Sequence, residues 1–183
     1  MESGTDTCLE LDHASEESLQ SYCLQCKTGK ETMLASFITE HYFPAAAFCA
    51  IQEKHRSLKG VKELVRQVML PGYIFIYGGD NIPFHSILRL HNALRFLKYE
   101  DGEGFSLRGS DALFADWLFQ NGGVFSCSKA IQTGTQVKIV SGPLSDHIGR
   151  VIKIDKHNRN ICLSISFDAM ERVVWMPFEW VAD

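Results

Sequence analysis

The order of apolar and polar positions divides the chain into an α/β part followed by an all-β part. Residues 22–26 form a short apolar run that predicts a strand, and apolar side chains at helical spacing then predict a helix up to about residue 42. Further strands are predicted over residues 48–51, 68–77, 94–99 and 105–107. Two more helices are predicted, one beginning near residue 81 and one near residue 110.

Local signals add detail to the α/β part. Thr28 with Glu31 three residues later predicts a capping box at the start of the first helix. Residues 53–63 are charged, contain a glycine and show no clear period, which predicts a mobile loop or a hairpin tip. The long predicted strand over residues 68–77 is interrupted by Pro71 and Gly72.

After residue 134 the pattern is typical of β structure alone. Runs rich in β-branched residues occupy 137–139, 151–154, 161–165 and 173–175, and turn residues separate them. Several short strands in about 50 residues suit a small barrel. The sequence therefore predicts an α+β protein with an acidic mobile extension over 1–19, an α/β domain over 20–121, a linker over 122–131 and a β-barrel over 132–183.

Composition limits the class of protein. The chain has 183 residues, of which 45% are hydrophobic and 22% charged, as in ordinary globular proteins. Its longest unbroken apolar stretch, residues 44–51, is far shorter than the ~20 residues that span a bilayer. The acidic N-terminus lacks the pattern of a signal peptide. We therefore expect a soluble cytoplasmic protein without membrane contact.

Charge and cysteine usage narrow the candidate chemistry. The net charge is −4, and the first 19 residues carry six acidic side chains and no Lys or Arg, so any nucleic-acid contact must be a local basic patch. The Cys23-x-x-Cys26 pair has no second pair at zinc spacing, and the six cysteines are scattered as in a reduced cytosolic protein. Motifs for phosphate loops, metalloproteases and nucleophile elbows are missing from the sequence. We expect neither an enzyme, nor a cofactor, nor a metal site.

Three segments resemble, in the right order, the NusG family of transcription elongation factors. Residues 22–31 resemble the first strand and helix of its N-terminal domain, and residues 70–76 resemble its "FPGY" strand. Residues 134–139, with 142–144, 149–151 and 154–155, resemble a KOW motif. The resemblance covers about residues 20–183. It implies a NusG N-terminal α/β sandwich, with an antiparallel sheet and helices, followed by a small KOW β-barrel.

The resemblance is greatest to specialised members of the family. Residues 98–102 stand where general factors have a "GG" turn, and residues 142–144 and 153–159 resemble LoaP, an antiterminator paralog. This implies an elongation and antitermination factor that suppresses pausing and termination. Two alternatives remain open, a general Rho-linked NusG and a ribosome-associated KOW protein that binds RNA. Ribosomal KOW proteins are usually strongly basic, and the pI of about 6.0 disfavours the last reading.

The family resemblance also implies partners and a docking surface. The N-terminal domain would dock, as a monomer, on the clamp helices of the large subunit of RNA polymerase. Alternation along the strand places Tyr73 and Phe75 on one side and Ile74 and Ile76 on the other. Tyr73 and Phe75 are the expected anchors, unless all four side chains are core. Weaker candidates for polymerase contact are Leu70, Phe96, Trp117, His85 and Ser86.

Basic residues give candidate contacts to nascent RNA or non-template DNA. Lys27 and Lys30 flank a helix start, where cations oppose the macrodipole but favour a bound phosphate. A basic run and a barrel turn hold the other candidates, although each could be solvated surface instead: Lys54, Arg56, Lys59, Lys62, Arg66, Lys153, Lys156, His157 and Arg159.

Four residues of the predicted barrel have expected roles of another kind. Phe167 resembles the position through which family barrels touch partners such as the ribosome or Rho, although a core role is equally expected. Gly142, Pro143 and Gly149 are expected to be structural. Glycine permits unusual backbone angles, and the Gly-Pro pair fixes the turn between barrel strands.

Overall fold

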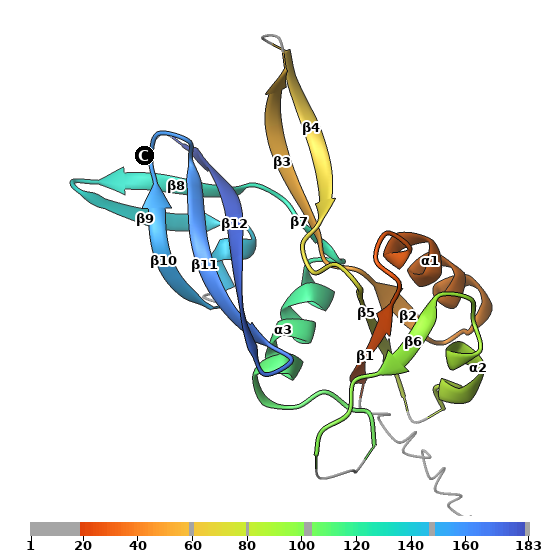
Figure 1. Cartoon of the computed structure of the whole chain (residues 1–183). Helices are drawn as coiled ribbons and strands as arrows, with labels where there is room; N and C mark the ends of the chain where they lie inside the picture. Colours follow the sequence, from red (N-terminus) through yellow and green to blue (C-terminus); the bar gives the residue numbers. More distant parts are fainter. Residues whose placement is uncertain (1–18, 59–60, 80, 101–103, 147–148, 182–183) are drawn as a thin grey trace, which may run out of the picture.

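The computed structural model describes residues 19–58, 61–79, 81–100, 104–146 and 149–181, and its strands form three sheets (Figure 1). The central sheet has the order β2-β5-β1-β6, a small sheet has the order β4-β3-β7, and the C-terminal sheet has the order β10-β11-β12-β8-β9. The helices are α1 (Glu31–His41), α2 (Phe84–Leu88) and α3 (Gly109–Gln120). No described helix has the length and apolar character needed to cross a membrane. The result is a mixed α/β fold, in agreement with the sequence pattern.

The central sheet is antiparallel and buries both of its faces. It contains β1 (Gln20–Cys26), β2 (Ala46–Phe48), β5 (Tyr73–Gly78) and β6 (Ala93–Phe96). Ile74 and Ile76 pack with α1 on one face, whereas Phe75 and Tyr77 pack with α3 on the other. The alternation expected along this strand is therefore confirmed, and β5 presents aromatic rings to a single side.

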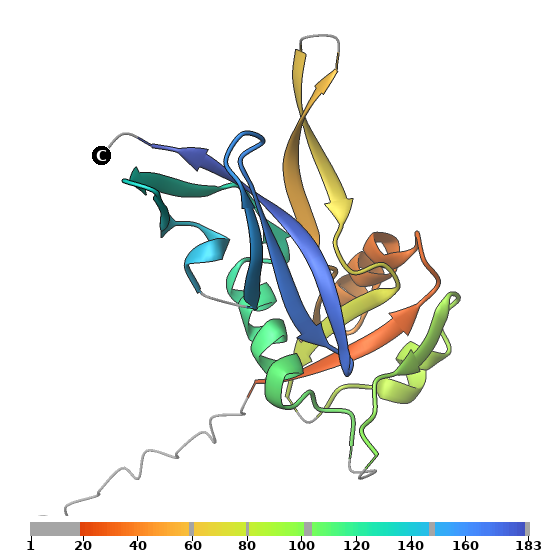
Figure 2. The same ribbon diagram turned by 60° about the vertical axis from the view of Figure 1, so that its left-hand side comes forward.

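A long hairpin projects from the body of the molecule (Figures 1 and 2). It consists of β3 (Ile51–Leu58) and β4 (Val61–Val68), so the charged segment expected as a loop or hairpin tip is mostly paired strand. At its base β3 pairs in parallel with β7 (Val124–Phe125). Part of the segment expected as a linker thus belongs to a sheet.

The C-terminal sheet consists of β8 (Ser128–Thr133), β9 (Gln136–Ser141), β10 (Arg150–Asp155), β11 (Asn160–Phe167) and β12 (Met170–Trp180). A 3-10 turn, η1 (Pro143–Asp146), lies between β9 and β10. β11 and β12 form a hairpin whose two-residue turn, Asp168-Ala169, has positive φ at both positions, as in a type I′ turn. The tip of this hairpin lies at the foot of α3 in Figure 1 and crosses β1 in Figure 2, and the Gln25 amide of β1 donates to the Asp168 carboxylate in its turn.

The predicted capping box is corrected by the structure. Helix α1 begins at Glu31 after Lys30, and no side chain caps it. Glu31 is buried, and its carboxylate accepts a hydrogen bond of 2.7 Å from the backbone N–H of Gly72. Tertiary packing therefore takes Glu31 away from the helix start, because the Pro71-Gly72 turn needs an acceptor that local sequence does not provide.

Candidate docking surface under the C-terminal hairpin

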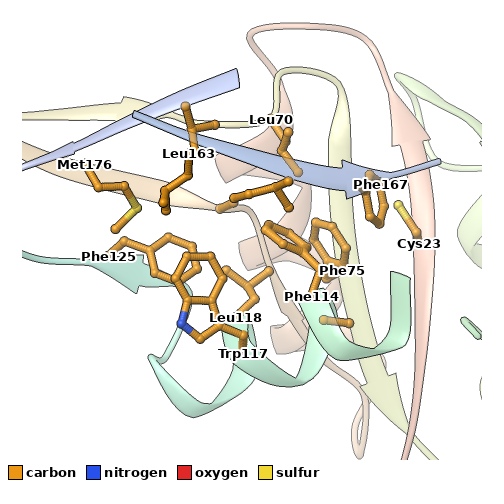
Figure 3. Packing of buried hydrophobic residues seen from close by; sticks show 14 of the residues in the cluster. Cys23, Leu70, Phe75, Phe114, Trp117, Leu118, Phe125, Leu163, Phe167 and Met176 are labelled. Carbon is orange, nitrogen blue, oxygen red and sulfur yellow. The ribbon is translucent and has the colours of Figure 1, made fainter. Parts of the chain in front are cut away.

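The aromatic side of β5 is covered by the tip of the β11–β12 hairpin (Figure 3). Phe167, the last residue of β11, is fully buried, and its ring centroid lies 5.4 Å from that of Tyr73, 5.1 Å from Phe75 and 5.5 Å from Phe114. Phe75 is also fully buried. One hydrophobic cluster therefore joins the central sheet, α3 and the C-terminal sheet.

Polar contacts surround the buried Phe167 ring, which is called the plug below. The Tyr73 hydroxyl donates to the Asp168 carboxylate at 2.8 Å, and the Arg172 guanidinium donates to the Tyr73 oxygen at 3.2 Å. The Asp111 carboxylate accepts two hydrogen bonds, one of 3.1 Å from the backbone N–H of Asp168 and one of 2.9 Å from the Tyr99 hydroxyl. Residues from the hairpin and from the N-terminal half thus hydrogen-bond to each other in a defined geometry, whereas the buried Nε of Arg172 has no hydrogen-bond partner among the described residues.

The phenols in this cluster are held in their neutral form. Burial raises the pKa of Tyr73, and the hydrogen bond to Asp168 raises it further. Burial, together with the hydrogen bond to Asp111, raises the pKa of Tyr99 to about 12. Both groups therefore remain donors to carboxylates across the neutral range, which keeps two acidic side chains tolerable at the contact.

A second contact lies at the other end of α3. The Trp117 ring stacks on Phe125 with centroids 4.1 Å apart, and its indole N–H donates to the Pro143 carbonyl at 3.0 Å. The Gln52 amide, at the base of the long hairpin, donates to the Trp175 carbonyl of β12. The C-terminal sheet is consequently fastened along α3 as well as at the hairpin tip.

The structure gathers some of the predicted polymerase-binding residues and separates others. Leu70 and Trp117 belong to the same cluster as Tyr73 and Phe75. Phe96 belongs to the second cluster, because it pairs with Leu24 of β1 and shares the face of that residue. The prediction that Phe96 shares a surface with Tyr73 is therefore wrong, because the two side chains lie on opposite faces of the central sheet. His85 and Ser86 are exposed on α2, which packs with that second cluster through the buried Ile87.

The predicted basic positions are scattered over three places. Lys27 and Lys30 are exposed before α1. On the long hairpin, Lys54 donates to Gln67 and Arg66 forms an ion pair of 2.8 Å with Glu53. Lys59 lies outside the described residues, as do the side chains of Arg56 and Lys62.

The third basic place is the turn between β10 and β11. Lys153, Lys156, His157 and Arg159 are all exposed there. Asp155 shapes the turn, since its carboxylate accepts from the backbone N–H of Asn158 at 2.9 Å, and this hydrogen bond lowers the pKa of Asp155. The Lys156 ammonium donates to the Thr135 carbonyl at 2.7 Å. The turn thus has a defined geometry, and Lys153, Lys156 and Arg159 form no ion pair with another described residue.

The two glycines expected to be structural are required by close approach. Gly142 has a φ of +94°, and a Cβ there would lie 2.8 Å from the Ser128 Cα. Gly149 has a φ of +82°, and a Cβ there would lie 2.6 Å from the Ser164 carbonyl oxygen. Both positions combine left-handed backbone with lack of space, so only glycine fits without distortion.

Sequence reasoning missed the polar half of this site. Asp168 was only a turn residue in the pattern, and neither Asp111 nor Arg172 stood out. A turn of Asp and Ala marks a hairpin but says nothing about what its tip will touch. No local signal could have joined residues that lie 57 positions apart, as Asp111 and Asp168 do.

The cysteines and the acidic side chains near the candidate site are the remaining groups with possible chemistry. Among the described residues no group of three or more His, Cys, Asp or Glu side chains could hold a metal ion. Burial raises the pKa of the Cys23 thiol well above its ordinary value, and that of Cys26 to about 11, so neither is an activated nucleophile. The arrangement buries the aromatic side of β5 under the tip of the β11–β12 hairpin.

Taken together, a central antiparallel sheet with helices on both faces and a C-terminal β sheet define a two-part mixed α/β fold. Solved structures with this fold include NusG from Thermotoga maritima, in a structure described by its domain interaction. The similarity has a TM-score of 0.53 at 18% sequence identity and covers 87% of this chain and 93% of that one. No family model matches the chain, and no curated protein matches it.

Proposed function

We propose that this chain is a NusG-type transcription elongation factor that docks on RNA polymerase through the aromatic side of β5. One observation carries the proposal. Tyr73 and Phe75, where the family resemblance expects the polymerase anchors, are covered by Phe167, where it expects a partner contact of the barrel. The two expected binding surfaces mask each other. The described arrangement is then the unbound, closed state, and docking requires the C-terminal sheet to move away.

The finer function that we propose is antitermination, with the C-terminal sheet recruiting RNA or a protein. The segments similar to LoaP support this specialisation. Lys27 and Lys30, together with the cations of the β10–β11 turn, stay exposed while the aromatic surface is covered. Nucleic acid can therefore contact the closed protein first. Binding energy gained there can favour opening only if it is larger in the open state.

The closed state reduces polymerase affinity by the fraction of molecules that are open. Each 1.4 kcal/mol that stabilises the closed contact makes that fraction about tenfold smaller. Weakening the plug should therefore tighten polymerase binding, whereas removing an anchor should weaken it. The opposite changes in polymerase affinity distinguish Phe167, which covers the docking surface, from the anchors on β5 that form this surface.

The test measures binding of the full chain to core RNA polymerase. Phe167→Ala removes the cover and should bind more tightly than the natural protein. Adding Tyr73→Ala to Phe167→Ala removes an anchor from a protein that already lacks the cover. The double variant should bind more weakly than Phe167→Ala, by about 2 kcal/mol or more if Tyr73 is a hot spot. Tyr73→Phe is the matched control, because it keeps the ring and loses only the contacts of the hydroxyl, which are to Asp168, Arg172 and Gln25. It should bind at least as well as the natural protein.

Equal polymerase affinity for Phe167→Ala and for the double variant Phe167→Ala with Tyr73→Ala would refute the docking assignment, because the cover is absent from both proteins. The antitermination proposal needs a second measurement, read-through of an intrinsic terminator in transcription with purified components. An increase in read-through supports it. Increased termination that depends on added Rho would instead favour a general elongation factor.

A further inference from the structure

Helix α1 carries apolar side chains outside the face that it buries. Met33 and Phe37 lie one turn apart on the helix, and they are 57% and 40% exposed. The outward face of a surface helix is normally polar, so packing of the fold does not account for these two side chains. The buried face of the helix is formed by other residues, Glu31, Leu34, Ala35 and Ile38.

The two exposed side chains form one wall of an apolar groove of about 240 Å³. Its other wall is the connection between α2 and β6, which contributes Leu90, His91 and Asn92, and the buried Leu34 also lines it. The groove lies on the side of the central sheet that faces away from the C-terminal sheet (Figure 1). It is therefore separate from the Tyr73 surface, and the inference drawn from it does not rest on polymerase docking.

Basic side chains border both walls of this groove. Lys30 precedes Met33 by three positions and therefore lies on the same side of α1. Lys27 adjoins the other wall, because its backbone N–H donates to the Asn92 carbonyl at 2.9 Å. Arg89 immediately precedes Leu90 in that wall.

The three cations, Lys27, Lys30 and Arg89, are called the basic rim. All three are exposed, and none forms an ion pair with another described residue. Glu40, the exposed acid of α1, lies on the flank of the helix that faces away from Leu34. An apolar groove with unpaired cations at its border is complementary to a partner that is both apolar and acidic.

The Phe37 ring favours a protein over a nucleic acid as that partner. A nucleic-acid base binds an aromatic side chain by stacking on its face. His41 already stacks on the Phe37 ring, with centroids 4.0 Å apart and an angle of 13° between the planes. The other apolar side chains of the lining are Met33, Leu34 and Leu90, which are flexible or aliphatic and pack readily against apolar side chains.

The length of the apolar stripe matches a helix. From Lys30 to His41 the stripe measures about 16 Å at a rise of 1.5 Å per residue, or about three turns. Helices that pack along each other interdigitate rows of side chains spaced three or four positions apart. Met33 and Phe37 form such a row, so a helix of similar length can cover the stripe.

We propose that the groove between α1 and the α2–β6 connection binds an acidic amphipathic helix of another protein. Aliphatic side chains one turn apart on this helix pack against Met33 and Phe37, and its carboxylates face the basic rim. The groove is open while the C-terminal hairpin covers Phe75, so the partner binds the closed protein as well as the open one.

Binding of a synthetic peptide to the full chain tests the proposal. The probe is a labelled helix of about four turns, with two leucines one turn apart and glutamates on the same side, in a background of alanine and glutamine. We expect it to bind, and we expect a version with glutamine at every glutamate to bind at least tenfold more weakly. Absence of binding by the acidic peptide, or equal binding of both peptides, would overturn the proposal.

Substitutions in the groove locate the binding site. Phe37→Ala should weaken binding of the acidic peptide at least tenfold, and Met33→Ser should weaken it in the same direction without loss of an aromatic ring. Leu113→Ala is the matched control, because Leu113 is an exposed apolar residue of α3 outside the groove. Lys30→Glu should weaken the acidic peptide and improve binding of a peptide with lysines in place of the glutamates. Unchanged affinity in Phe37→Ala and Met33→Ser would overturn the assignment.

Two other occupants of the groove give different results. A labelled single-stranded oligonucleotide should bind Phe37→Ala and the natural chain alike, and a tenfold loss in Phe37→Ala would overturn the proposal in favour of base stacking. Sedimentation of the full chain should show a monomer, and a dimer that Phe37→Ala dissociates would mean that a second copy occupies the groove. Phe167→Ala, on the other side of the central sheet, should leave peptide affinity unchanged, which separates this test from the test of polymerase docking.

Discussion

Replacing Phe167 with alanine should open the closed contact and leave the C-terminal sheet folded. Phe167 is fully buried, yet the rings it touches, those of Tyr73, Phe75 and Phe114, all belong to the N-terminal half. Truncating a buried Phe costs about 3–5 kcal/mol, of which aromatic pairs contribute ~0.5–1.5 kcal/mol each. The loss therefore falls on the contact between the two halves.

The expected shift in population is large. A loss of about 3 kcal/mol changes the ratio of closed to open molecules by about 100-fold. Small-angle X-ray scattering of the full chain should then show a larger radius of gyration for Phe167→Ala. Far-ultraviolet circular dichroism should change little, because the β11–β12 pairing does not depend on this ring.

Phe119→Ala provides a matched control for this prediction. Phe119 lies on α3 and packs on Phe48 and Tyr77, so the same truncation removes aromatic contacts within the N-terminal half only. It should lower stability without expanding the molecule. If Phe167→Ala scatters like the natural protein and like Phe119→Ala, the hairpin tip does not hold the two halves together.

Three other predictions concern local features. Gly149→Ala should lower the melting temperature more than Gly134→Ala, because both glycines have positive φ but only Gly149 lacks space for a Cβ. The backbone strain shared by both variants is about 1–2 kcal/mol, and equal decreases in melting temperature would contradict the steric argument. The pKa of Tyr99 is about 12 in the folded protein against about 10 in the unfolded chain. The neutral phenol therefore contributes its full stabilisation below pH 10, and this contribution is lost as the pH rises to 12. The unfolding free energy of Tyr99→Phe should lack this decrease. Lys156→Ala and Arg159→Ala should each weaken binding of a leader RNA hairpin and lower its salt slope by about 1, measured by anisotropy, and unchanged slopes would mark the turn as solvated surface.

Local pattern was sufficient for several parts of the fold. The alternation in β5 assigned Ile74 and Phe75 to opposite faces, because strand side chains alternate regardless of what covers them. The β-branched runs after residue 134 predicted strands, and the structure has strands there. The sequence also located the glycine-dependent turns, since positions such as Gly149 are tied to backbone geometry.

Tertiary structure decided what those elements touch. The capping signal of Thr28 and Glu31 was overridden because a buried backbone N–H at Gly72 needed the Glu31 carboxylate. The charged segment expected as a mobile loop or a hairpin tip is mostly paired strand within a long hairpin, since pairing between its strands was not visible in either strand alone.

The cover over the candidate docking surface has the same origin. Tyr73 and Asp168 are separated by 95 positions, and their hydrogen bond exists only because the β11–β12 turn is carried onto the central sheet. The sequence could identify Phe75 and Phe167 as apolar residues suited to binding, but their mutual burial depends on the placement of whole sheets. Side-chain periodicity is a local property of the backbone, whereas contact between distant elements is set by the shape and packing of all the surfaces together.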